Sequence, residues 1–149
     1  MILFDSDVLA IYHFFTHDSR YEATRDCIDA FCKEEHAITI YNLLELAGII
    51  SSVGKVDLGK KIVTTYLNAA DMKVLFPRGY FSGDVFWEEY CSGIMDVIAR
   101  GVRYGDAKIL WVAELYDVSM IITWNTRHFT GKTKIPVKTP DNVNELRIE

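Results

Sequence analysis

The chain opens with the sequence MILFDSD, residues 1–7, in which a short apolar run stops at closely spaced aspartates. An apolar run of this length, bounded by polar residues, is typical of a strand that is buried on both faces. The stretch therefore predicts a buried strand over residues 1–4, with Asp5 and Asp7 at its carboxyl end.

Further along the chain, short strand candidates alternate with longer helical segments. Strands are predicted over residues 37–40, 72–76 and 119–123, with an edge strand near Val137 between Pro136 and Pro140. Helices are predicted over residues 8–15, 21–34, 42–52, 57–70, 82 or 84 to about 100, and 106–116. Because helices rather than hairpin turns join the strands, we predict a three-layer α/β/α fold with a mostly parallel sheet of four or five short strands.

Capping patterns predict where several helices begin and end. Ser19 and Glu22 have the spacing of a capping box, and Asp57 is a suitable N-cap for the helix over residues 57–70. Ser82 or Asp84 is expected to open the long helix that reaches residue 100. Gly54 suits the end of the helix over residues 42–52, because glycine adopts the left-handed conformation that closes many helices.

Length and composition restrict the class of protein. A chain of 149 residues is the size of one domain, so we treat residues 1–149 as a single unit. Half of the residues are hydrophobic and a quarter are charged, which excludes intrinsic disorder. Acidic residues outnumber basic ones by 21 to 16, giving a net charge of −5. This balance excludes a generally basic nucleic-acid binder but not a basic rim around an acidic pocket.

Cysteine usage and hydropathy indicate the compartment. Cys27, Cys32 and Cys91 form no CxxC pair, which disfavours a disulfide scaffold or a thiolate zinc site and favours a reducing compartment. No apolar run approaches the ~20 residues that a membrane-spanning helix needs. Asp5 and Asp7 interrupt the region that would be apolar in a secretory signal. We therefore expect a cytoplasmic protein without a membrane partner.

Polar side chains are predicted to meet at one edge of the sheet. Parallel strands end at a common edge, and ligands bind there. Asp5 and Asp7 follow the first strand, Glu45 lies one turn into the helix after the second, Asp106 begins the helix before the fourth, and Asn125 follows that strand. Clustered carboxylates repel one another unless a cation neutralises them. Mg²⁺ binds oxygen ligands and assists phosphodiester hydrolysis, so we predict a magnesium site, with Mn²⁺ as a substitute.

Four motifs in this order resemble those of a known family. The segments FDSDVL (residues 4–9), LEL (44–46), GDA (105–107) and ITWNTRHF (122–129) are similar to the ordered motifs of PIN-domain ribonucleases, including the VapC-type toxins of prokaryotic toxin–antitoxin pairs. The resemblance extends from the first strand to residues 136–140. It implies a PIN-like fold and a metal-dependent endoribonuclease that leaves a 5′-phosphate and a 3′-hydroxyl. It also implies a homodimer and a small antitoxin partner.

The resemblance assigns roles to individual residues. Asp5, Glu45 and Asp106 match the three acids of the family pattern, and would be catalytic residues and metal ligands. The fourth site of the family carries an Asp, or an Asn followed by an acid three residues later. Here Asn125 and His128 stand at those positions, so the acid is missing from both. We expect Asn125 to be an auxiliary ligand and catalytic residue, with one firmly bound ion and a second that enters with substrate.

Other residues near these motifs are predicted to contact the substrate. Asp7 stands where many relatives carry Asn or Ser, and it offers a replacement charge. Arg127 and His128 would lie near the rim of the pocket beside Asn125. Aromatic residues also flank the acidic positions, and for them core packing is favoured over base stacking: Tyr41, Tyr104, Trp124 and Phe129.

Simpler explanations exist for each motif taken alone. Asp5, Asp7 and Asp106 could each be no more than a helix cap. Glu45 is harder to explain in this way, because it interrupts the apolar stretch LLELA over residues 43–47. His13 and His17 have metal-ligand spacing, but no third ligand is evident, which favours ordinary histidines.

Two rival functions remain open. The missing fourth acid favours a PIN fold that binds RNA or a protein partner without cutting. A receiver-like phosphoacceptor domain also places aspartates at strand ends. It requires an acceptor aspartate after a central strand, whereas the third strand here ends in LFP, residues 75–77.

Overall fold

The computed structural model describes residues 1–78 and 83–142, which contain a five-stranded sheet in the order β3-β2-β1-β4-β5. Every pairing in this sheet is parallel. The strands are β1 (Ile2–Phe4), β2 (His36–Thr39), β3 (Met72–Leu75), β4 (Met120–Ile122) and β5 (Val137–Lys138). The order reverses between β1 and β4, where a ligand crevice is expected in sheets of this kind. Receiver domains have the order 2-1-3-4-5, so the receiver-like alternative is wrong.

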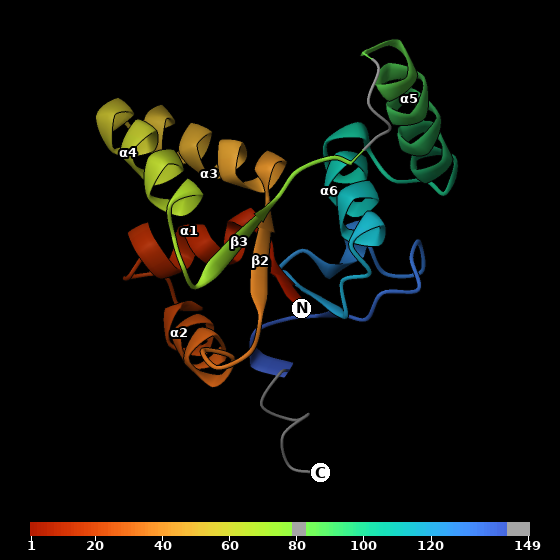
Figure 1. Ribbon diagram of the computed structural model, residues 1–149. Coiled ribbons are helices and arrows are strands. Elements are labelled where there is room, and N and C mark those ends of the chain that lie inside the picture. The colour runs from red at the N-terminus through yellow and green to blue at the C-terminus, as the bar shows by residue number, and fades with distance from the viewer. Residues whose placement is uncertain (79–82, 143–149) are drawn as a thin grey trace.

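Helices cover both faces of the sheet (Figure 1). On one side lie α1 (Ser6–Phe14), α2 (Tyr21–Ala30), α3 (Ile40–Ser52) and α4 (Val56–Leu67), and on the other lies α6 (Tyr104–Leu115), against which α5 (Gly83–Ala99) packs. A short 3₁₀ helix, η1 (Thr126–His128), follows β4. Within the described ranges, no helix combines the length and the hydrophobicity that a bilayer crossing requires.

Alternation along the first strand explains the two layers of core. Ile2 and Phe4 are buried among side chains of α1 to α4, whereas Leu3 is buried among side chains of α5 and α6. Successive residues of a strand point to opposite faces, so a central strand with helices on both sides must be apolar throughout. The three-layer α/β/α fold predicted from the sequence is therefore confirmed.

Two of the predicted helix caps are wrong. Arg20, with no side-chain cap, precedes α2, and the Ser19–Glu22 capping box does not form. Asp18 orders this turn instead, since its carboxylate accepts hydrogen bonds from the backbone N–H and the guanidinium of Arg20. Likewise Lys55 precedes α4, and Asp57 lies within its first turn.

The other helix ends agree more closely with the predicted patterns. Gly54 follows the end of α3 with φ of +82°, as a closing glycine should. Asp84 lies in the first turn of α5, and the alternative residue, Ser82, lies outside the described residues. Asp106 also lies inside a first turn, because Arg103 is the residue that precedes α6. The explanation of Asp106 as a helix cap is therefore wrong.

Candidate active site at the carboxyl edge of the sheet

Asp5 lies at the reversal point of the sheet and is only 7% exposed. It is the N-cap of α1, where its Oδ1 accepts a 2.8 Å hydrogen bond from the backbone N–H of Ser6. The same oxygen accepts a 2.7 Å hydrogen bond from the Asn42 amide, and Oδ2 accepts one of 2.8 Å from the Thr123 hydroxyl. A cap requires no partners from α3 and the end of β4, so capping explains only part of this arrangement.

Ser6 joins Asp5 to the second predicted acid. Its hydroxyl donates a 2.5 Å hydrogen bond to Oε2 of Glu45, and it lies 3.3 Å from Oδ1 of Asp5. Glu45 is solvent-exposed on α3, whereas Asp5 is buried beneath it. The Ser6 hydroxyl therefore lies between the two carboxylates and keeps them close together.

The electrostatics of Asp5 indicate an uncompensated negative cluster. Burial raises the pKa of Asp5, hydrogen bonds from Thr123 and Ser6 oppose that rise, and the negative charges of Glu45 and Asp106 add to it. Acids from three separate elements thus influence one another. Within residues 1–78 and 83–142, neither Asp5 nor Glu45 forms an ion pair with a lysine or arginine. The site is therefore short of positive charge.

Asp7 is turned toward the loop that follows β4. Its carboxylate accepts a 3.0 Å hydrogen bond from the Trp124 backbone N–H and lies 3.3 Å from the oxygen of the Thr123 hydroxyl, which donates to Asp5. The Asn125 side-chain amide lies 3.4 Å from the same carboxylate. Burial, followed by the charge of Asp5, raises the pKa of Asp7 to about 7. Asp7 and Asn125 therefore face each other across the edge of the site.

Asp106 meets the histidine that stands in place of the missing acid. Nδ1 of His128, on η1, lies 3.4 Å from Oδ2 of Asp106 in the first turn of α6. Arg127 is exposed on the same short helix. Each site residue predicted from the sequence thus lies on an element next to the sheet edge. At the fourth site of the family pattern, however, the side chain that approaches Asp106 is the imidazole of His128 and not a carboxylate.

A cavity of about 380 Å³ opens beside these carboxylates. We call it the α3–α6 cavity, because residues of those two helices line it: Tyr41, Leu44, Glu45, Gly105, Asp106, Lys108 and Ile109. Two of the three predicted acids therefore face a space large enough for part of a ligand.

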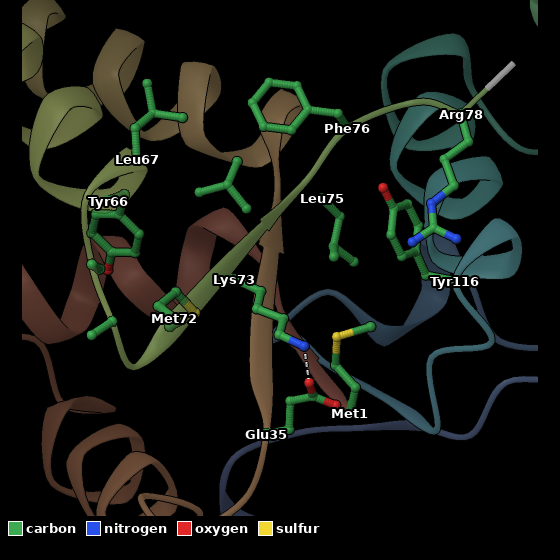
Figure 2. A pocket seen from close by; sticks show the side chains of 13 residues that line it. Met1, Glu35, Tyr66, Leu67, Met72, Lys73, Leu75, Phe76, Arg78 and Tyr116 are labelled. Carbon is green, nitrogen blue, oxygen red and sulfur yellow. Dashed lines mark hydrogen bonds and ion pairs between the residues drawn. The ribbon is translucent and has the colours of Figure 1, made fainter.

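A second cavity, of about 510 Å³, runs along the edge strand β3 (Figure 2). Lys73 and Glu35 form an ion pair in it, and the Arg78 guanidinium lies 3.8 Å from the centre of the Tyr116 ring. None of the predicted site residues lines this cavity. The chemistry suggested by the sequence therefore belongs to the smaller cavity.

Three buried polar residues that support Asp5 were not identified from the sequence. Asn42, Thr39 and Thr123 are fully buried. The Thr39 hydroxyl donates a 2.6 Å hydrogen bond to the Asn42 side-chain oxygen, which leaves the Asn42 N–H groups facing Asp5. Their positions in the sequence could have indicated this role. β2 ends in Thr39 and β4 is followed by Thr123, so both hydroxyls lie at the sheet edge where Asp5 follows β1.

The donor set suits a hard divalent cation. In the part of the chain that the structure describes, no three His, Cys, Asp or Glu side chains are gathered closely enough to hold one ion directly. Mg²⁺ keeps several water ligands, so one or two carboxylates are sufficient direct contacts. Asp5, Glu45 and Asp106 provide only oxygen donors and an unbalanced negative charge, which is the chemistry that such an ion requires.

Comparison with solved structures identifies the fold. The chain is similar to a toxin–antitoxin complex from Klebsiella pneumoniae, with 18% identity, a TM-score of 0.63, and coverage of 94% of this chain and 98% of that one. It is similar to VapC20 of Mycobacterium tuberculosis, described as a sarcin–ricin loop cleaving toxin, with 13% identity, a TM-score of 0.59, and coverage of 81% and 87%.

A third similar structure is VapBC2 from Rickettsia felis bound to a promoter DNA fragment, with 16% identity, a TM-score of 0.63, and coverage of 93% and 98%. No protein-family model and no curated protein matches the sequence. At these low sequence identities, the structural similarity establishes the fold alone. The chain has the PIN-type fold of VapC toxin–antitoxin proteins, as the motifs predicted.

Proposed function

We propose that this chain is a divalent-metal-dependent endoribonuclease that acts as the toxin of a toxin–antitoxin pair. The observation that carries the proposal is the convergence of Asp5, Glu45 and Asp106, because the charges of the other two acids act on the buried Asp5 and, among the described residues, no lysine or arginine forms an ion pair with Asp5 or Glu45. The fold supports it, because it is the fold of several toxin–antitoxin proteins, one of them described as cleaving the sarcin–ricin loop.

The proposed site divides the work between ligands and supporting residues. Asp5, Glu45 and Asp106 would hold Mg²⁺ or Mn²⁺, one or two of them directly and the others through its water ligands, with Asn125 as an auxiliary ligand. The bound ion would supply an activated water and positive charge at the phosphate. The chain's own contribution is rigidity: hydrogen bonds to Asp5 and Glu45 fix the orientation of both carboxylates before substrate arrives.

Cleavage of structured RNA in the presence of Mn²⁺ tests the proposal. Asp5→Asn removes one charge at the proposed site, whereas Asp57→Asn makes the same chemical change on the exposed first turn of α4. We expect Asp57→Asn to cleave like the wild type and Asp5→Asn to lose activity by on the order of a hundredfold or more. Equal cleavage by all three proteins would overturn the assignment.

A second candidate function is RNA or protein binding without cleavage. The observation that favours it is His128, which stands where relatives carry an acid and contacts Asp106. Calorimetric titration separates the two functions. Absence of Mn²⁺ binding at millimolar concentration would favour the non-cleaving scaffold, and binding that Asp5→Asn abolishes would favour the nuclease.

A small antitoxin and a second copy of the chain are the proposed protein partners. The similar structures support the first, since one is a toxin–antitoxin complex and another is a VapBC2 complex on DNA. Co-expression with the product of a small reading frame found next to the gene tests it: co-purification is expected, and separate elution, or the absence of any such reading frame, would contradict it. Light scattering tests the second, because a dimer has twice the 17.1 kDa mass of the chain.

A further inference from the structure

The α3–α6 cavity contains one cation whose position is unusually restricted. Nζ of Lys108 lies 5.0 Å from the centre of the Tyr41 ring and 4.8 Å from the centre of the Tyr104 ring. An ammonium near an aromatic face is attracted by the negative charge of the ring face. Two rings from different helices therefore hold Lys108, which would otherwise have a freely rotating side chain.

A third tyrosine adjoins the two rings. The side chain of Tyr90, on α5, lies close to those of Tyr41 and Tyr104. The Tyr90 ring in turn packs edge-on against Trp111, with 5.3 Å between ring centres. Because Trp111 is buried, this chain of contacts ties the rings around Lys108 to the core between α5 and α6.

Lys108 keeps hydrogen-bonding capacity for a ligand. It lines the same cavity as Glu45 and Asp106, yet it forms no ion pair with either of them within 4.0 Å. An ammonium carries three N–H donors, and contacts with ring faces do not replace an anionic oxygen. A positive group is thus held in place beside carboxylates that would repel an anion.

We propose that the α3–α6 cavity binds a phosphate of single-stranded RNA, with Lys108 as the cationic contact. The proposal rests on the proposed nuclease function and extends it, because it assigns a binding site to an RNA phosphate that lies next to the acidic residues. Leu44, which is 54% exposed, and the adjoining Tyr41 provide an apolar surface for the nucleotide that carries this phosphate.

RNA binding without cleavage tests this site. Fluorescence anisotropy with a short single-stranded oligonucleotide is measured in EDTA at several salt concentrations. Loss of one phosphate contact lowers the slope of log K against log salt by ~0.7 for a single strand. We therefore expect Lys108→Met to bind several-fold more weakly with a shallower slope, and Lys108→Arg to retain most of the affinity.

Lys73→Met is the matched control, because it removes the same charge from the cavity along β3. It should bind like the wild type. Equal affinity and slope for the wild type and Lys108→Met, or absence of RNA binding by the wild type, would overturn the phosphate site. Binding that depends on Lys108 without Mn²⁺-dependent cleavage would instead overturn the nuclease and leave this site standing.

Discussion

The Thr123 hydroxyl donates a 2.8 Å hydrogen bond to Oδ2 of Asp5 across the point where the strand order reverses. Asn42 holds the other oxygen of Asp5 from α3. All three side chains are buried. The orientation of the first acid is consequently set by folding of the sheet and not by a ligand, and its supporting residues should affect stability as well as activity.

Substitution of Asn42 should therefore be costly. Asn42→Ala removes one of the hydrogen bonds to the buried Asp5 carboxylate and takes away the acceptor of the buried Thr39 hydroxyl, and we expect the free energy of unfolding to fall by about 1–3 kcal/mol. Asn68→Ala is the control, because its exposed amide donates only to the Thr64 carbonyl near the end of α4. Chemical denaturation measures both variants, and similar losses in the two would contradict the role given to Asn42.

Metal binding should stabilise the folded chain through Asp5. At 100 times its dissociation constant, an ion that binds only the native state contributes ~2.7 kcal/mol. The midpoint temperature of thermal unfolding should therefore rise when Mn²⁺ is added to the wild type or to Asp57→Asn, and it should return to the metal-free value when EDTA is added. Asp5→Asn should show no shift, and a shift equal to that of the wild type would place the ion elsewhere.

The sheet was predictable because burial leaves a simple mark on the sequence. The run over residues 1–4 is apolar since β1 has helices on both faces, and the predicted bounds of β2, β3 and β4 differ from the structure by one residue at most. Helix starts were less predictable. Ser19 and Asp57 satisfy local capping rules. In the structure, however, Asp18 accepts the hydrogen bond from the backbone N–H of Arg20 before α2, and α4 begins one residue earlier than Asp57, after Lys55.

Only the charged residues of the site could be predicted from the sequence. Asp5, Glu45 and Asp106 stand out as acids at strand ends or within apolar stretches. Asn42 and Thr39 resemble an ordinary helix start, and only the tertiary contact with Asp5 reveals their role. The arrangement around Lys108 was equally hidden, because it depends on a tertiary contact with Tyr41, which lies 67 residues away in the sequence.

Asp7 should make stability depend on pH. Its pKa is about 7 in the folded chain, against 3.8 as the ordinary value, so the folded state binds its proton more tightly than the unfolded state. Stability from this group is fully present below about pH 4, is lost as pH rises to 7, and is constant above that. Relative to Asp7→Asn, the wild type should lose on the order of 4 kcal/mol between pH 4 and 8. Urea unfolding at intervals across this range measures the difference, and parallel profiles would contradict it.

Two helical glycines should respond oppositely to alanine. A methyl group at Gly48, on α3, would meet no atom within 4 Å, so Gly48→Ala should raise the free energy of unfolding by about 0.5–1 kcal/mol. A methyl group at Gly93, on α5, would overlap the indole ring of Trp111, so Gly93→Ala should lower it by about 1–3 kcal/mol. Thermal unfolding of the pair checks the packing of α5 on α6, and a stabilised Gly93→Ala would show that packing to be wrong.

Replacement of His128 should alter the affinity for metal. His128 contacts Asp106 at 3.4 Å, at the position where relatives with the Asn-type fourth site carry an acid. His128→Asp removes that contact and adds a carboxylate beside the third acid. Affinity for divalent ions rises with the number of ligand charges, so calorimetry should give a dissociation constant for Mn²⁺ several-fold lower than that of the wild type. Without metal, the added repulsion should lower the thermal midpoint.

The control is His17→Asp, which makes the same chemical change at an exposed residue in the turn before α2. It should leave the affinity for Mn²⁺ unchanged. If both variants bound Mn²⁺ equally, the gain would come from net charge alone, and His128 would not adjoin the ion. If His128→Asp bound more tightly and also cleaved RNA faster, the histidine would be what weakens this site relative to one with a complete set of acids.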